Sequence, residues 1–180
     1  MKKAITYKTA MCALFAALTA VFSQIAIPIG PVPINLATLA VFCAGALLGP
    51  SLGALSLAIY VIIGAAGAPV FSLFRGGIGI LTGPTGGYIV GYIPAAFIVG
   101  LLIEKLNKSK KIYIYPAAML CGMLTYFILG TAWFMFSTGT GFLGALMVCV
   151  VPFLPGDFLK IAVATMLAKR LSHVFRRLNN

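Results

Sequence analysis

Asp157 and Lys160 form a pair of opposite charges deep inside an apolar stretch of the sequence. Counting back from Lys169 at about 1.5 Å per residue places Asp157 roughly 18 Å into a hydrocarbon core about 30 Å thick. A charge at such a depth costs about 2.5–3.5 kcal/mol on insertion scales, so its presence needs a reason. The spacing of three residues puts both side chains on one helix face, where they can form a structural ion pair. Pro155-Gly156 beside them frees backbone groups to line a cavity, which favours a binding site.

Arg75 is the second candidate for binding a polar ligand. It lies in a long connection, residues 67–84, that is rich in glycine yet still apolar, and we expect this connection to fold back onto the protein. Gly76 and Gly77 follow the arginine and allow the backbone to approach a ligand closely. The alternative is that Arg75 extends toward lipid headgroups, and the residues alone favour neither reading.

Three aromatic residues, Tyr88, Tyr92 and Trp133, could form the wall of an apolar binding site. Tyrosine and tryptophan also collect at membrane interfaces without any ligand. From their positions alone, the interfacial interpretation is the better one.

The sequence lacks the constellations that enzymes and metal sites need. It has no nucleophile with an adjacent base, no H-E-x-x-H, no paired carboxylates and no phosphate-binding G-x-x-x-x-G-K-[ST]. The four cysteines stand alone inside apolar runs, and the single histidine, His173, lies in the basic tail. We therefore expect neither catalysis, nor a metal site, nor a cofactor, and any use of ATP would belong to another chain.

The elements that position these residues are membrane helices. With 62% hydrophobic and 8% charged residues, the composition is that of a chain whose solvent is lipid. We predict an all-α membrane protein forming one domain over residues 1–180, with an uncleaved first helix. Its six predicted transmembrane helices span residues 9–27, 35–48, 51–66, 85–103, 112–136 and 143–171.

Proline and glycine predict where these helices turn or break. The second and third runs are short, and only Gly49-Pro50-Ser51 separates them, so we expect a tight hairpin there. The sixth run is longer than one crossing requires. Because Pro152 and Pro155 interrupt it, this run must kink or start twice.

The basic residues predict the orientation in the membrane. Eleven of the thirteen Lys and Arg residues lie at the N-terminus, in the turn 104–111 or in the C-terminal tail, and six spans place all three on one side. Because basic loops stay in the cytoplasm, both termini are predicted to be cytoplasmic and Arg75 to face outward. Charge in this arrangement belongs to membrane topology and gives no support for nucleic-acid binding.

The first helix carries closely spaced small residues, among them Ala13, Ala16, Ala17 and Ala20. Such spacing lets another helix approach closely. That helix could belong to a partner subunit or to this same bundle, and the spacing does not distinguish the two.

Four segments carry a resemblance to a known family. They are PVPINLATLAV (31–41), LLGPSLGALS (47–56), GAAGAPVFSLFRGGIGILTGPTGGYIVGY (64–92), and GTAW (130–133) together with PFLPGDFLK (152–160). These segments resemble the BioY family, the biotin-binding S components of energy-coupling-factor (ECF) transporters. In the first segment the family often shows Thr and Gln where this chain has Asn35 and Ala37, so no role of that Gln is carried over.

The resemblance implies an S-component fold in a bacterial plasma membrane and high-affinity binding and uptake of biotin. It also implies a transmembrane coupling (T) subunit and two ATP-binding-cassette ATPases, which consume the ATP. Within the family the vitamin site falls on Asp157 and Lys160, and the coupling subunit contacts the positions of Ala13 and Ala17. The remaining candidate ligand contacts are Asn35, Arg75, Gly76, Gly77, Tyr88 and Trp133, and Ala16 and Ala20 complete the candidate partner surface.

Biotin chemistry suggests a pose for these candidates. The Asp157 carboxylate would accept a ureido N–H, and Lys160 would neutralise Asp157 and donate toward ligand oxygen. Trp133 and the apolar connection would cover the bicycle, while Arg75 or the glycine-rich backbone would meet the valerate carboxylate. The alternatives are an S component for another vitamin, a stand-alone biotin carrier driven by an ion gradient, and a structural scaffold.

Overall fold

The computed structural model describes residues 2–106 and 111–178, most of them in helices. Lys108 and Lys110, which belong to the predicted cytoplasmic turn, lie outside the described residues. The side chain of His173 is likewise not described.

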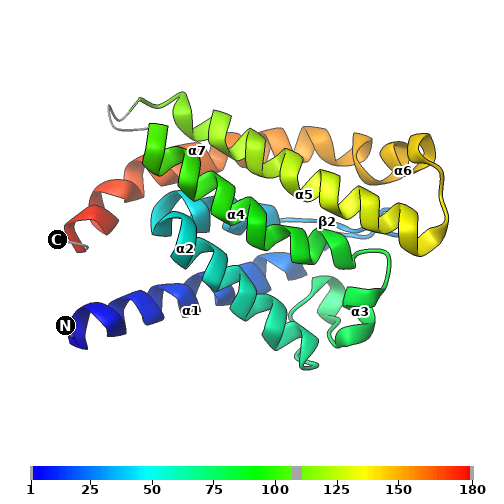
Figure 1. Ribbon diagram of the computed structural model, residues 1–180, viewed down its shortest axis with the longest axis horizontal. Coiled ribbons are helices and arrows are strands. Elements are labelled where there is room, and N and C mark those ends of the chain that lie inside the picture. The colour runs from blue at the N-terminus through cyan, green and yellow to red at the C-terminus, as the bar shows by residue number, and fades with distance from the viewer. Residues whose placement is uncertain (1, 107–110, 179–180) are drawn as a thin grey trace.

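Five helical segments are long and apolar enough to cross a membrane. They are α1 (Lys2–Gln24), α2 (Ala37–Ala65), α4 (Gly86–Leu106), α5 (Ile114–Thr138), and α6 (Phe142–Cys149) with its continuation into α7 (Leu154–Leu178). Shorter elements connect them: β1 (Ala26–Ile27), β2 (Ile34–Asn35), η1 (Ser72–Phe74), α3 (Ile78–Thr82) and η3 (Val151–Phe153). The long helices form an elongated bundle with both chain ends at one end of it and α3 and α6 at the other (Figure 1).

Helix α2 folds back on itself at Gly49, as the sequence predicts. Gly49 has a φ of 79° and a ψ of −176°, which is not helical, and Pro50 follows it. A Cβ added at Gly53 would lie 3.0 Å from the Cα of Gly45, whereas residues eight apart in a straight helix are about 12 Å apart. The hairpin is therefore confirmed, and its two arms, residues 37–48 and 50–65, are each shorter than the about 20 residues of a full membrane crossing. The total of six spans stays a prediction.

The last apolar run starts twice, also as predicted. Helix α6 ends at Cys149, Val150 leaves helical geometry, and Pro152 lies in the short η3 turn before α7 begins at Leu154. Proline cannot donate a backbone hydrogen bond, so the break falls where the sequence places it. As a result Asp157 lies in the first turn of α7.

The connection between α2 and α4 folds back onto the bundle, as expected from its apolar sequence. Phe71 is 1% exposed and its ring meets the edge of Tyr60 at a centroid distance of 5.5 Å. The same ring lies so close to Gly64 that a side chain there would overlap it. The connection also contains helix α3, which the sequence did not predict.

Helix α4 packs closely between α2 and α5. A Cβ at Gly45 of α2 would lie 2.5 Å from the carbonyl oxygen of Ala96, and one at Gly122 of α5 would lie 2.5 Å from the Val99 side chain. Glycine at such positions lets membrane helices approach closely. This packing fixes the relative positions of the helices that carry the candidate site.

Candidate ligand-binding site

A pocket opens between α2, α4, α5 and α7, and its empty space is about 640 Å³ including the open mouth. Its polar lining residues are Asn35, Thr38, Ser72, Arg75, Thr85, Tyr88, Tyr92, Tyr126, Asp157 and Lys160. Its apolar lining residues are Val32, Pro33, Phe71, Ile80, Ile89, Phe127 and Phe153.

The predicted charge pair is an ion pair in the wall of this pocket. Lys160 Nζ lies 2.8 Å from Asp157 Oδ1, and the two side chains are 7% and 1% exposed. Helical spacing of three residues brings them together on α7. The geometry is consistent with a structural ion pair, because the two charges neutralise each other, and also with a binding site, because both residues line the pocket.

Two hydroxyl groups from other helices complete the surroundings of Asp157. The Thr38 hydroxyl on α2 donates to Oδ1 at 3.2 Å, and the Tyr126 hydroxyl on α5 donates to Oδ2. A buried carboxylate needs such partners, because an uncompensated buried charge is strongly destabilising. The network joins three helices around one carboxylate.

The ion pair keeps hydrogen-bonding capacity for a ligand. An ammonium group has three N–H donors, and Lys160 uses one of them on Asp157. A carboxylate has about four acceptor positions, of which three are occupied here. The pair can therefore both donate to and accept from a ligand group that presents a carbonyl beside N–H bonds.

The mouth of the pocket is built from two connections. Asn35 accepts the backbone N–H of Ala37 at 2.9 Å, and its Nδ2 donates to the Ser72 hydroxyl at 2.7 Å. Arg75 follows on the same connection, is exposed, and forms no salt bridge within the described part of the chain. The mouth thus offers a cation to an anionic group, while the interior offers the ion pair.

The structure brings six candidates from the sequence analysis to this pocket: Asn35, Arg75, Tyr88, Tyr92, Asp157 and Lys160. Tyr88 and Tyr92 are each 6% exposed, so the interfacial interpretation is wrong for these two residues. Gly76 and Gly77 do not line it. Gly76 packs against the backbone of Ala68, and Gly77, with a φ of 94°, donates its N–H to Gly64 and precedes α3. Both glycines serve the turn that follows Arg75.

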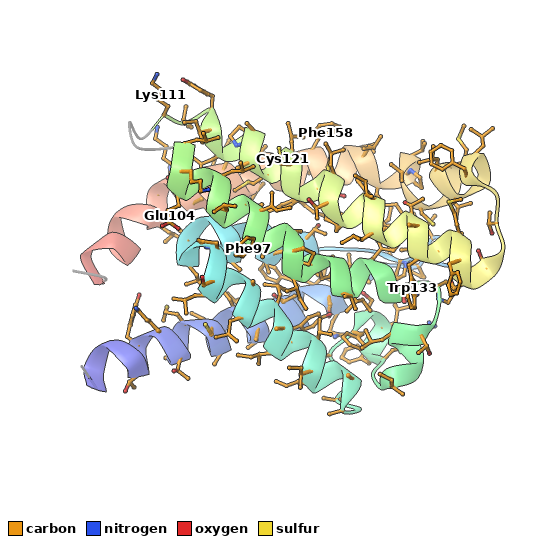
Figure 2. All side chains as sticks on the ribbon, in the orientation of Figure 1. Phe97, Glu104, Lys111, Cys121, Trp133 and Phe158 are labelled. Atoms are coloured by element: carbon orange, nitrogen blue, oxygen red, sulfur yellow. The ribbon has the colours of Figure 1, made fainter. Side chains whose placement is uncertain are left out.

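Trp133 lies outside the pocket, contrary to the pose expected from the sequence. It lines a second hollow between α4 and α5, together with Leu81, Gly86, Gly87, Val90, Gly91 and Leu129. Its ring N–H donates to the carbonyl of Gly83 at 3.0 Å. Figure 2 shows Trp133 toward the end of the bundle opposite Glu104 and Lys111, where the interfacial interpretation would place it.

Sequence reasoning missed Thr38 and Tyr126. Thr38 lies in the segment PVPINLATLAV, so its position in that motif was an available signal. Tyr126 lies outside the four family segments, and the only signal for it was a hydroxyl group within an otherwise apolar helix. Both residues matter because they bond the carboxylate of Asp157.

The alanines of α1 fall on two different faces. Ala13 and Ala17 are exposed, whereas Ala16 is 5% exposed within the core and Ala20 packs partly buried against it. The prediction of one partner surface is therefore corrected, since Ala16 and Ala20 take part in packing inside this chain. A spacing of four residues joins Ala13 to Ala17, and the same spacing joins Ala16 to Ala20 on the inner face.

No group of three or more His, Cys, Asp or Glu side chains within the described residues could hold a metal ion.

Comparison with known proteins gives one consistent result. A family model described as the BioY family matches residues 1–177. The chain is 43% identical over 164 residues to the "Probable biotin transporter BioY" of Pyrococcus horikoshii, covering 91% of this chain and 95% of that protein. It is 40% identical over 158 residues to the "Biotin transporter BioY" of Thermotoga maritima, covering 88% and 91%. The crystal structure of an "S-component for biotin from an ECF-type ABC transporter" superposes with a TM-score of 0.84 at 29% identity, covering 94% of this chain and 90% of that one.

Proposed function

The chain belongs to the BioY family, and we propose that it binds and takes up biotin as the S component of an ECF transporter. The observation that carries this function is the Asp157–Lys160 ion pair in the wall of a pocket with polar and apolar lining, within a multi-pass membrane bundle. The family consists of transport components rather than enzymes. No cofactor is needed for binding, and biotin is the ligand.

The distribution of charge in the pocket suggests how biotin lies in it. The ureido group carries a carbonyl flanked by two N–H bonds, which match the free donors of Lys160 and the remaining acceptor position of Asp157. The apolar bicycle would pack against residues such as Phe71 and Phe127. The valerate carboxylate is strongly hydrated, so it would stay at the exposed mouth beside Arg75.

Uptake requires energy that this chain does not supply by itself. We propose that a transmembrane T subunit and two ATP-binding-cassette ATPases associate with it, and that the ATPases consume the ATP. The exposed face of α1 with Ala13 and Ala17 is the proposed contact with the T subunit.

Paired substitutions on α1 test this partner surface. Ala17→Trp should leave biotin binding unchanged and abolish uptake, because it places a large side chain on the exposed face that a helix of the T subunit would contact. Ala16→Trp is the matched control, and it should lower the melting temperature because position 16 is buried. Equal loss of binding and uptake in Ala17→Trp would assign that face to packing within the bundle.

The proposed location is the bacterial plasma membrane with both termini in the cytoplasm. The clustering of eleven basic residues supports this orientation. In a variant without native cysteines, an impermeant thiol reagent on intact cells should label a cysteine at position 75 and not one at position 111. The reverse pattern would invert the topology.

A ligand panel tests the function itself. A ligand that binds the folded state stabilises it by RT ln(1 + [L]/Kd), so biotin should raise the melting temperature of the purified chain in detergent. Riboflavin and thiamine should not. Stabilisation by another vitamin would support a sibling S component, and uptake by the chain without ATPases would support a stand-alone carrier.

A further inference from the structure

The last turn of α1 holds the segment that follows α2. The buried Ser23 hydroxyl donates to the Val70 carbonyl. Gln24 Nε2 lies 3.1 Å from the Val70 carbonyl oxygen and 3.2 Å from that of Phe71. The other end of the same amide, Gln24 Oε1, accepts the backbone N–H of Phe74 at 2.8 Å. One side chain therefore bonds both sides of the turn formed by residues 71–75.

This turn has an unusual backbone. Leu73 and Phe74 have φ angles of 62° and 56°, in the left-handed region that residues other than glycine rarely adopt. Such conformations persist only where the surrounding structure enforces them. Phe74 is 72% exposed, so burial of its side chain does not hold it there. The bond from its N–H to Gln24 and the backbone pairing of Phe71 with Arg75 hold the turn, together with the bond from Asn35 to Ser72.

The turn carries two residues of the pocket mouth, Ser72 and Arg75. Ser72 is bonded to Asn35, but the Arg75 side chain has no salt bridge to orient it in the described part of the chain. Its position relative to the pocket therefore depends on the backbone of the turn. Gln24 does not line the pocket, yet it fixes that backbone.

We infer that Gln24 is a positioning residue that sets Arg75 at the pocket mouth and thereby determines selectivity for a ligand carboxylate. This inference rests on the proposed binding of biotin. It predicts that the hydrogen bonds of Ser23 and Gln24 to residues 70–74 affect recognition of the ligand's carboxylate and leave recognition of its ureido group unchanged.

The test compares biotin with biotin amide, which has the same bicycle but no charge on the side chain. Dissociation constants for both are measured on the wild type, Arg75→Met, Gln24→Met and Gln24→Asn. The wild type should prefer biotin by about tenfold or more, as expected for one charge-assisted hydrogen bond. Arg75→Met and Gln24→Met should lose this preference through weaker binding of biotin alone. Gln24→Asn keeps the amide but is too short to reach the turn, so it should lose most of the preference as well.

A control variant removes a side-chain hydrogen bond that lies within a single helix, α5, and does not involve the 71–75 turn. The Thr125 hydroxyl donates to the Cys121 carbonyl at 2.8 Å on the exposed side of α5, so Thr125→Val should keep the preference. If Gln24→Met does not fold, Gln24→Asn decides. The inference is overturned if the foldable Gln24 variants keep the wild-type preference or weaken both ligands equally. Equal binding of biotin and biotin amide by the wild type would also overturn the inference about Gln24. If the wild type binds neither ligand, both this inference and the proposed function are overturned.

Discussion

Two hollows lie beside α4 and α5, and they differ in what converges on them. The pocket at Asp157 receives polar side chains from four helices and two connections, including a buried ion pair bonded by two hydroxyl groups. The hollow at Trp133 is lined by seven residues with one polar side-chain atom among them, and that atom is already bonded to Gly83. A site that must recognise a polar ligand in a membrane needs free donors and acceptors, which only the first hollow has. An aromatic side chain beside an opening is therefore a weaker indicator of a site than convergent polar groups.

Asp157→Asn should have the largest effect. It keeps the size of the side chain and removes the charge, so the buried Lys160 loses its counter-ion and the ligand loses a charge-assisted partner. Biotin affinity should fall by about 1.5–3 kcal/mol, roughly tenfold to 160-fold. Equilibrium binding of labelled biotin measures it, and unchanged affinity would remove the Asp157 pocket from biotin recognition.

Arg75→Met should weaken biotin binding less, by about tenfold, because the lost contact lies at the exposed mouth. Raising the salt concentration should reduce the difference between this variant and the wild type, since exposed charges are screened. Salt-independent loss of affinity would mean that the arginine acts through packing instead of charge.

Tyr126→Phe should weaken biotin binding by about threefold, less than the loss of a charge-assisted bond to the ligand itself, because the Tyr126 hydroxyl bonds the Asp157 carboxylate and acts on the ligand only through it. The melting temperature should fall as well, because Asp157 Oδ2 loses its buried partner. Thr38→Val removes the corresponding bond to Oδ1 and serves as the matched variant. Affinity for biotin that rises in either variant would contradict a role in holding Asp157 for the ligand.

Trp133→Phe should have the smallest effect, with biotin affinity within about twofold of the wild type. The substitution leaves an aromatic ring in the hollow and removes the hydrogen bond to Gly83, so about 0.5–1.5 kcal/mol of stability should be lost. Calorimetry and labelled-biotin binding on one preparation separate the two quantities. If Trp133→Phe lost as much biotin affinity as Asp157→Asn, the hollow at Trp133 would also have to be part of the binding site.

The parts of the fold that proline, glycine and charge determine locally could be predicted from the sequence. Gly49-Pro50 predicted the hairpin in α2, and Pro152 with Pro155 predicted the restart before α7. The spacing of Asp157 and Lys160 predicted their contact, since it depends only on helix geometry.

The contacts between helices depend on which face each helix turns toward its neighbours. In an apolar chain the spacing of hydrophobic residues gives little information about these faces. The side chain of Tyr126, which bonds Asp157, is 31 residues away from it in the sequence, and that of Thr38, which also bonds it, is 119 residues away. Ala16 and Ala17 are neighbours in sequence, yet one is buried and the other exposed. The outward and inward faces of these helices are both apolar, so the sequence pattern does not separate them as it does in water.

The most direct test of the central claim, that the Asp157–Lys160 pair is a ligand site, is the double variant Asp157→Asn with Lys160→Met. Biotin affinity and melting temperature are measured on it and on both single variants in the same detergent. We expect the double variant to regain stability lost in the singles, because no unpaired charge remains buried, while its biotin affinity stays low. A double variant that regains stability and binds biotin like the wild type would show that the pair is only structural and would contradict the site proposed here.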